Sequence, residues 1–184
     1  MLTCVLLLTG IPGVGKTTVL TRTVDALKSE GYTVGGMISR EARKGGIRVG
    51  FEILDVNSGR RGWLAHTNQK SGPQVGRYRV NIEDLNSIGT QAILAAMENC
   101  DVIAIDEIGP MELFSEKFKE ATRKALESGK LVLAVVHWKA QDRLIVEARN
   151  RPGAELVTVT SENREKLHET IVERALMALK RAKM

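Results

Sequence analysis

The sequence contains few cysteines, and they do not form a metal-binding pattern. There are two in 184 residues: Cys4 lies in a predicted buried strand, and Cys100 immediately precedes another. A chain of this length can build a hydrophobic core without the support of disulfides or a structural metal. We therefore expect two reduced thiols, which is typical of a cytoplasmic protein.

A long apolar run of the kind that crosses a membrane is also missing. Residues 2–8 are apolar, but no basic residues precede them and a glycine-rich segment follows at once, so they do not fit a signal peptide. No other run approaches the about 20 apolar residues of a transmembrane helix. We expect no membrane contact.

Concentrated positive charge is missing as well. The 27 Lys and Arg exceed the 22 Asp and Glu by a formal net charge of +5. The basic residues are scattered, and no dense basic block is interleaved with aromatic residues, which make up 4% of the chain. Nucleic acid is therefore not an expected partner, whereas a mild basic excess suits phosphate ligands. The basic residues at 180–183 are interpreted as a solvated helix end.

What the sequence does contain is a phosphate-binding loop. The pattern G-x-x-x-x-G-K-[ST] is matched within Gly10-Ile11-Pro12-Gly13-Val14-Gly15-Lys16-Thr17-Thr18. Glycines in such a loop let successive backbone N–H groups point at an anion near a helix N-terminus. Lys16 is predicted to bridge the β- and γ-phosphates, and the Thr17 hydroxyl is predicted to bind Mg²⁺. The sequence therefore predicts a nucleotide-binding protein.

Hydrophobic periodicity predicts one α/β domain over residues 1–184. After the apolar run at residues 4–8, strands are expected at 33–39, 101–106, 131–136 and 155–159, and helices at 17–28, 82–97, 114–127, 139–150 and 161–180. This alternation is typical of a mainly parallel central sheet with helices on both faces.

One part of the chain interrupts this alternation. The alternating residues after Val49, the turn Asn57-Ser58-Gly59 and a second run at 60–64 predict a β-hairpin within residues 41–65, inserted after the second strand. Residues 66–80 are rich in Gly, Pro, Gln and Lys. We expect them to form a mobile loop that orders when nucleotide binds.

A second group of chemically important residues ends the strand predicted at 101–106. With the phosphate loop, we predict that it forms the nucleotide site: Val102-Ile103-Ala104-Ile105-Asp106-Glu107-Ile108-Gly109. A carboxylate at the C-terminal end of an apolar strand can hold Mg²⁺ opposite the loop threonine. A carboxylate beside it can activate the water that attacks the γ-phosphate. Thr17 and Asp106 are therefore the predicted metal ligands, and Lys16 and Glu107 the predicted catalytic residues.

Several segments together resemble one known family. They are the phosphate loop, Gly45-Gly46-Ile47-Arg48-Val49-Gly50-Phe51, Val75-Gly76-Arg77-Tyr78, Ile105-Asp106-Glu107-Ile108-Gly109-Pro110-Met111-Glu112-Leu113-Phe114-Ser115 and Thr160-Ser161-Glu162-Asn163-Arg164. They resemble the small nucleoside-triphosphate phosphatases first described from thermophiles, a family that includes the human cancer-related nucleoside triphosphatase. The resemblance spans nearly the whole chain. It implies a RecA-like sheet with an interposed strand, and slow hydrolysis of ATP, GTP and other nucleoside triphosphates to diphosphate and phosphate.

Three classes of function remain open: a hydrolase, a small-molecule or nucleotide kinase, and a nucleotide-dependent switch or assembly protein. The arginines at 143, 149 and 151 can form a lid that clamps a transferred phosphoryl group, which favours a kinase. Glu107 favours a hydrolase, because a kinase must exclude water whereas an acid beside the metal ligand activates it. An Asn-Lys-x-Asp motif that would read guanine is missing before the last helix, and Ile11 stands where some assembly ATPases have lysine, so the third class is disfavoured.

Contacts to the base and to the γ-phosphate are the least determined part of the site. Asn163 and Arg164 follow the last predicted strand, where such folds hold the base. Thr160 and Ser161 in the same segment are equally good helix caps, and plain capping is the favoured interpretation. His137 ends the strand at 131–136, which in the implied sheet order lies between the phosphate-loop strand and the Asp106 strand. Its ring either approaches the γ-phosphate or bonds to neighbouring backbone, and Arg43 is a further candidate phosphate contact. Broad base tolerance is expected, and a monomer is favoured.

Overall fold

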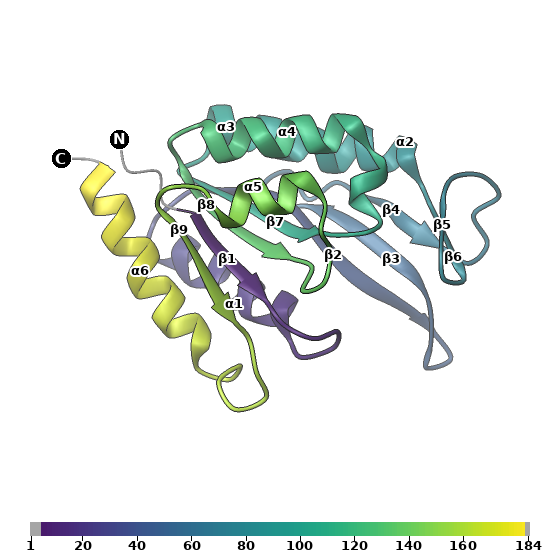
Figure 1. Cartoon of the computed structure of the whole chain (residues 1–184), viewed down its shortest axis with the longest axis horizontal. Coiled ribbons are helices and arrows are strands. Elements are labelled where there is room, and N and C mark those ends of the chain that lie inside the picture. Colours follow the sequence, from purple (N-terminus) through teal and green to yellow (C-terminus); the bar gives the residue numbers. More distant parts are fainter. Residues whose placement is uncertain (1–4, 183–184) are drawn as a thin grey trace.

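The fold is built on one nine-stranded sheet. The computed structural model describes residues 5–182, so the predictions for Cys4 and Lys183 lie outside the described residues. Within them the strand order is β5-β6-β4-β3-β2-β7-β8-β1-β9 (Figure 1). The five strands of the parallel half are β1 (Val5–Thr9), β2 (Val34–Lys44), β7 (Val102–Ile108), β8 (Leu131–Val136) and β9 (Ala154–Thr158).

The parallel half has the strand order that was expected around the phosphate loop. Strand β8 lies between β1 and β7, and Ala134 is the register partner of both Leu7 and Ile105. All three strands are parallel, so their C-terminal ends meet at one edge of the sheet, where α/β proteins bind ligands. The residues that follow β1, β7 and β8 are therefore brought together.

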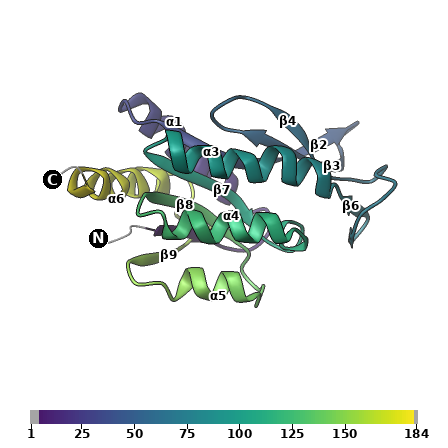
Figure 2. The same cartoon turned by 90° about the horizontal axis from the view of Figure 1, so that it is seen from above.

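Helices cover both faces of the sheet, as the alternating pattern predicted. Helices α1 (Lys16–Ser29) and α6 (Leu167–Ala182) lie on one face, and α3 (Gln91–Asn99), α4 (Glu116–Glu127) and α5 (Arg143–Arg149) lie on the other (Figures 1 and 2). Strand β1 shows why both faces are needed. Val5 and Leu7 belong to the core under α3–α5, whereas Leu6 and Leu8 belong to the core under α1 and α6. A strand that buries both faces reads as a continuous apolar run.

The predicted helix at residues 82–97 is present but is not regular. A short helix, α2 (Ile82–Asp84), leads into a π-helical turn (Leu85–Thr90) and then into α3. The Asn81 side chain accepts a hydrogen bond from the backbone N–H of Asp84 and begins the segment.

The antiparallel half of the sheet is larger than the predicted hairpin. It consists of β3 (Ile47–Asp55), β4 (Arg61–His66), β5 (Gln74–Val75) and β6 (Tyr78–Val80). The predicted turn between β3 and β4 is confirmed, but β2 does not end at residue 39. It runs on to Lys44 and pairs with β3 across a turn at Gly45 and Gly46, which both have positive φ.

Residues 66–80 were wrongly expected to be a mobile loop. They contain the β5–β6 hairpin, and Tyr78 and Val80 are buried. The Tyr78 ring lies 5.3 Å from that of Phe51, and its hydroxyl accepts a hydrogen bond of 2.9 Å from Nε of Arg48. These contacts come from another strand, so the polar composition of the segment does not reveal them.

Side-chain caps explain where two predicted helices begin later than expected. Helix α4 begins at Glu116 because the Ser115 hydroxyl accepts a hydrogen bond from the N–H of Phe118. Helix α5 begins at Arg143 because the Asp142 carboxylate accepts one from the N–H of Leu144. Helix α6 begins only at Leu167, since the residues before it form turns, whereas β7 continues past its predicted end at residue 106 to Ile108.

No helix within residues 5–182 is long and apolar enough to cross a membrane. The expected cytoplasmic location and the expected monomer stay predictions.

Candidate functional site

The phosphate loop joins β1 to α1 at the C-terminal edge of the parallel strands. Its glycines at 10, 13 and 15 have φ values of 152°, 76° and 110°. Gly15 is the N-cap residue of α1, and no side chain caps that helix. The first N–H groups of α1 are therefore left for an anion, which the helix dipole also favours.

The ammonium group of Lys16 is folded back over this loop. The residue is 9% exposed, and its Nζ donates hydrogen bonds of 3.0 Å to the carbonyl oxygen of Gly10 and 3.2 Å to that of Ile11. A cation held above uncapped helical N–H groups makes the loop strongly attractive to phosphate.

Asp106 lies opposite the loop, near the end of β7. It is 1% exposed, and Thr17 lies near its carboxylate. Burial raises the pKa of Asp106 to about 7; the Thr17 hydroxyl and the Lys16 charge act in the opposite direction, and the Glu107 charge acts in the same one. Its Oδ2 atom is buried and has no hydrogen-bond partner among residues 5–182. A buried carboxylate oxygen without a partner is costly unless a cation or donor satisfies it.

Glu107 follows directly and is half-buried. Burial raises the pKa of its carboxyl group, and the Lys16 charge lowers it. A Cβ atom at Gly109 would lie 2.8 Å from Glu107 Oε1, so a glycine there leaves room for the carboxylate. The side chains from Val102 to Ile105 are fully buried in the sheet, so they support these acids rather than reach a ligand.

A third acid, Glu112, belongs to the same site and was assigned no role from the sequence. It lies in a 3₁₀ turn (Glu112–Phe114) and is 4% exposed. Burial raises the pKa of Glu112 well above its usual range, and the charges of Glu107 and Asp106 act in the same direction. A single glutamate among the apolar residues Met111, Leu113 and Phe114 was the available signal.

His137 lies at the same edge and bonds to neighbouring backbone. Its Nδ1 accepts hydrogen bonds from the N–H groups of Lys139 (3.3 Å) and Ala140 (3.1 Å). Burial lowers the pKa of His137, and the charges of Lys16, Arg149 and Lys139 act in the same direction. This backbone bonding is what one of the two predicted interpretations requires. Contact with a γ-phosphate stays a prediction.

The other candidate contacts are divided between two places. Arg43 is paired with Glu41 (2.7 Å) and donates to the carbonyl oxygen of Gly46, where the end of β2 pairs with β3. Arg164 lies beside the phosphate loop, with Nη1 3.5 Å from the carbonyl oxygen of Val14.

Asn163 closes the turn that follows β9. Its Oδ1 accepts from the N–H of Thr160, and its Nδ2 donates to the carbonyl oxygen of Thr158. The Thr160 hydroxyl in turn accepts a hydrogen bond of 3.3 Å from the N–H of Asn163. Helix α6 begins only at Leu167, so the predicted cap closes a turn and does not begin the helix.

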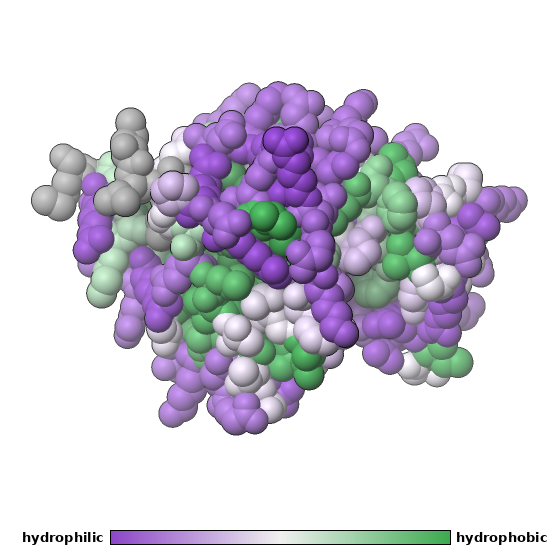
Figure 3. Space-filling model, in the orientation of Figure 1, coloured by the Kyte–Doolittle hydropathy of each residue, from purple (hydrophilic) through white to green (hydrophobic). Residues whose placement is uncertain are grey.

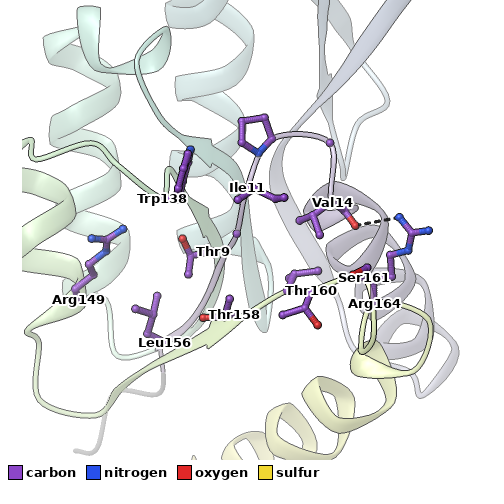
Figure 4. A pocket seen from close by; sticks show the side chains of 14 residues that line it. Thr9, Ile11, Val14, Trp138, Arg149, Leu156, Thr158, Thr160, Ser161 and Arg164 are labelled. Carbon is purple, nitrogen blue, oxygen red and sulfur yellow. Dashed lines mark hydrogen bonds between the residues drawn. The ribbon is translucent and has the colours of Figure 1, made fainter.

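A cavity of about 640 Å³ adjoins the phosphate loop on the side of β9 (Figure 4). It is lined by the first half of the loop, by Trp138 after β8, by Arg149 in α5, and by β9 with the turn that follows it. Trp138 has no role that its sequence motif predicts. Its position beside the loop depends on the sheet order and on the turn at His137.

The site combines a glycine loop before an uncapped helix N-terminus, a buried lysine, and an acid on β7, the strand beyond β8. These features define a P-loop nucleoside-triphosphate-binding protein of the α/β class. The model of the NTPase family matches residues 5–172. The chain belongs to this family, which confirms the resemblance noted in the sequence and the expected enzyme class.

Relatives of known name cover nearly the whole chain. The nucleoside-triphosphatase THEP1 of Thermofilum pendens is 47% identical over 165 residues, 88% of this chain and 89% of the relative. That of Methanosarcina acetivorans is 45% identical over 172 residues, 93% of this chain and 96% of the relative.

Solved structures share the fold. The crystal structure of THEP1 from Aquifex aeolicus matches with a TM-score of 0.83 and 32% identity, covering 93% of this chain and 98% of the other. The solution structure of a human cancer-related nucleoside triphosphatase matches with a TM-score of 0.78 and 35% identity, covering 93% and 96%. Both confirm the mixed α/β architecture with its mostly parallel sheet.

Proposed function

We propose that the protein hydrolyses nucleoside triphosphates to diphosphate and phosphate, that the reaction depends on Mg²⁺, and that all common bases are accepted. The observation that carries the proposal is the contact between the two motifs. Thr17 of the phosphate loop lies near Asp106, whose buried Oδ2 has no partner among residues 5–182, and the Lys16 charge acts against the burial that raises the pKa of both Asp106 and Glu107.

The residues present fit a magnesium ion. Asp106 offers a buried Oδ2 without a partner, and Thr17 offers a hydroxyl beside it. Among the described residues no cluster of three or more His, Cys, Asp or Glu can hold a metal. This suits Mg²⁺, which takes one or two protein ligands and completes its shell with water and substrate phosphates. When bound, it would neutralise charge on the β- and γ-phosphates.

The protein side chains divide the remaining tasks. The N–H groups at the start of α1 bind and orient the phosphates, and Lys16 leaves the carbonyl oxygens of Gly10 and Ile11 to stabilise the charge of the transferred phosphoryl group. Glu107 orients the attacking water and accepts its proton at the carboxylate, which its half-buried position and nearby lysine allow.

Two of the three arginines that favoured a kinase are held by contacts within the protein. Arg143 pairs with Glu147 at 2.6 Å, and Arg149 donates to the carbonyl oxygen of His137 at 2.9 Å. An acceptor-dependent transfer would show as γ-phosphate on the added acceptor and not on water, so phosphate release with and without small-molecule acceptors separates the two functions.

The proposal is tested by substituting the two acids separately. Glu107→Gln should keep nucleotide affinity and lose about two to four decades of turnover, whereas Asp106→Asn should weaken the Mg²⁺-dependent part of binding. Lys16→Ala should lose most turnover, and near-normal activity in that variant would sink the proposal. If calorimetry finds Glu107→Gln unable to bind nucleotide while Asp106→Asn binds normally, the two roles are reversed.

Base tolerance is tested by comparing kcat/KM for ATP, GTP, CTP and UTP. Values within about a hundredfold are expected, because the phosphate contacts do not read the base. A larger preference would contradict broad tolerance.

A further inference from the structure

The cavity beside the phosphate loop is placed to receive the part of a nucleotide that the loop does not hold. The backbone from Gly10 to Val14 lines the cavity and also forms the start of the phosphate cradle. A ligand whose phosphates lie at the N-terminus of α1 would therefore border this cavity. Its volume of about 640 Å³ lies within the usual range for small-molecule sites, about 300–1,000 Å³.

Apolar surface gathers in this cavity. Among the described residues seven large hydrophobic side chains are exposed, and three of them, Ile11 (56%), Trp138 (37%) and Leu156 (47%), line it. They come from three different segments of the chain (Figure 4). In Figure 3 the surface over β9 and the phosphate loop is apolar or weakly polar and is bordered by hydrophilic residues. Exposed hydrophobic residues that gather in a hollow are typical of a binding site.

Two polar groups in the wall have no partner. Thr9 is 8% exposed and Arg149 lines the same cavity, yet the Thr9 hydroxyl and the Nε atom of Arg149 are buried without a hydrogen bond to any residue in 5–182. Buried polar atoms are nearly always satisfied in folded proteins, so a ligand with hydroxyl or carbonyl groups is expected here.

The Trp138 ring is held in place by the turn that contains it. His137 accepts hydrogen bonds from the N–H groups of Lys139 and Ala140 and so fixes the backbone on both sides of Trp138. The Lys139 ammonium lies 4.2 Å from the centroid of the indole ring and covers one face. Trp138 is 37% exposed and lines the cavity, so its side chain is accessible to a ligand there.

We infer that this cavity is the nucleoside subsite and that Trp138 is the residue on which the base stacks. Ile11 and Leu156 complete the apolar wall, and Thr9 and Arg149 bond to polar groups of the ribose or the base edge. The inference rests on the proposed function, since it assigns the base and sugar of the same nucleotide. Stacking accepts every base because each base has a π face, which gives broad tolerance a structural cause.

The test is nucleotide affinity in three variants at Trp138, measured by calorimetry with ADP and Mg²⁺. Trp138→Phe keeps an aromatic face and should bind within a few-fold of wild type. Trp138→Leu and Trp138→Ala should lose about five- to a hundredfold in affinity, the value of one base–aromatic stack. If leucine serves as well as phenylalanine, or if alanine binds ADP normally, the inference is overturned.

Pyrophosphate is the control ligand, because it occupies the phosphate loop and has no base. Its affinity should be unchanged in all three variants, and a loss in the same proportion as for ADP would mean that Trp138 acts through the loop. A Trp63→Phe background leaves Trp138 as the single tryptophan, and its fluorescence should respond to ADP but not to pyrophosphate. These measurements do not use turnover, so a protein that binds ADP in this way and yet hydrolyses nothing would contradict the proposed function and leave the inference standing.

Discussion

Gly10 begins the phosphate loop, and the structure predicts that it is needed for the fold as well as for the phosphate. Its φ of 152° is rarely adopted by other residues, and a Cβ atom there would lie 2.6 Å from the carbonyl oxygen of Val159. That oxygen is backbone and has little freedom to move, because the N–H of Val159 is hydrogen-bonded to the carbonyl oxygen of Thr9 at 2.7 Å. Gly13 is the matched control: its φ is 76°, and a Cβ atom would meet nothing within 4 Å.

The expected losses follow from these two environments. Gly13→Ala adds only the strain of a left-handed residue, about 1–2 kcal/mol in the free energy of unfolding. Gly10→Ala adds comparable strain and a steric clash of about 1–3 kcal/mol, for a total of about 2–5 kcal/mol. In a chain of this size each kcal/mol lowers Tm by about 2–4 °C.

Urea denaturation of both variants without nucleotide measures the difference. Gly10→Ala should be less stable than Gly13→Ala by the clash alone. Equal stability, or a more stable Gly10→Ala, would refute the claim that the approach of Val159 requires glycine at this position.

Three further predictions concern stability. Wild-type protein should lose stability as pH falls through about 6.5, because the depressed pKa of His137 keeps its ring neutral in the folded state while the unfolded chain takes up a proton. The Oδ1 of asparagine can accept the same hydrogen bonds, so His137→Asn should reduce this loss in a pH series of denaturation curves. Glu112→Gln should raise stability at pH 7, because the raised pKa of Glu112 means that wild type takes up a proton on folding. The gain should vanish near pH 4, where the unfolded glutamate is protonated too. A variant that is as stable as wild type at both pH values would contradict this. Ser115→Ala should cost about 1–2 kcal/mol in the free energy of unfolding by removing the cap of α4, whereas Ser161→Ala at an exposed turn residue should change little in the same urea assay.

Much of the parallel half was predictable because its signals are local. The phosphate loop is one short stretch in which glycines, a lysine and a threonine stand at set positions. The apolar run before Asp106 marks a strand buried on both faces. The position of β8 between β1 and β7 followed from the resemblance to a family, and the structure confirms it.

The antiparallel half was predictable only in part. Alternation and the turn residues revealed the β3–β4 hairpin, but β2 has polar residues beyond position 39, and composition cannot show that they pair with β3. The β5–β6 hairpin depends on contacts of Tyr78 with Arg48 and Phe51, which lie about 30 residues away in the sequence. Pairing between distant segments leaves no periodic signal in a strand of two or three residues.

The chemistry of phosphate binding was thus encoded in short motifs, since backbone N–H groups, one ammonium group and one hydroxyl must follow each other at set positions. The environment of those groups was not encoded in the motifs. Glu112 becomes a buried neighbour of Asp106 and Glu107 only because a turn folds back toward the end of β7. Trp138 shares a wall with the phosphate loop because parallel strands bring their C-terminal ends to one edge, and Arg149 joins that wall from the end of α5, bonded to the carbonyl oxygen of His137. The burial that shifts a pKa or shapes a cavity arises only when these segments meet.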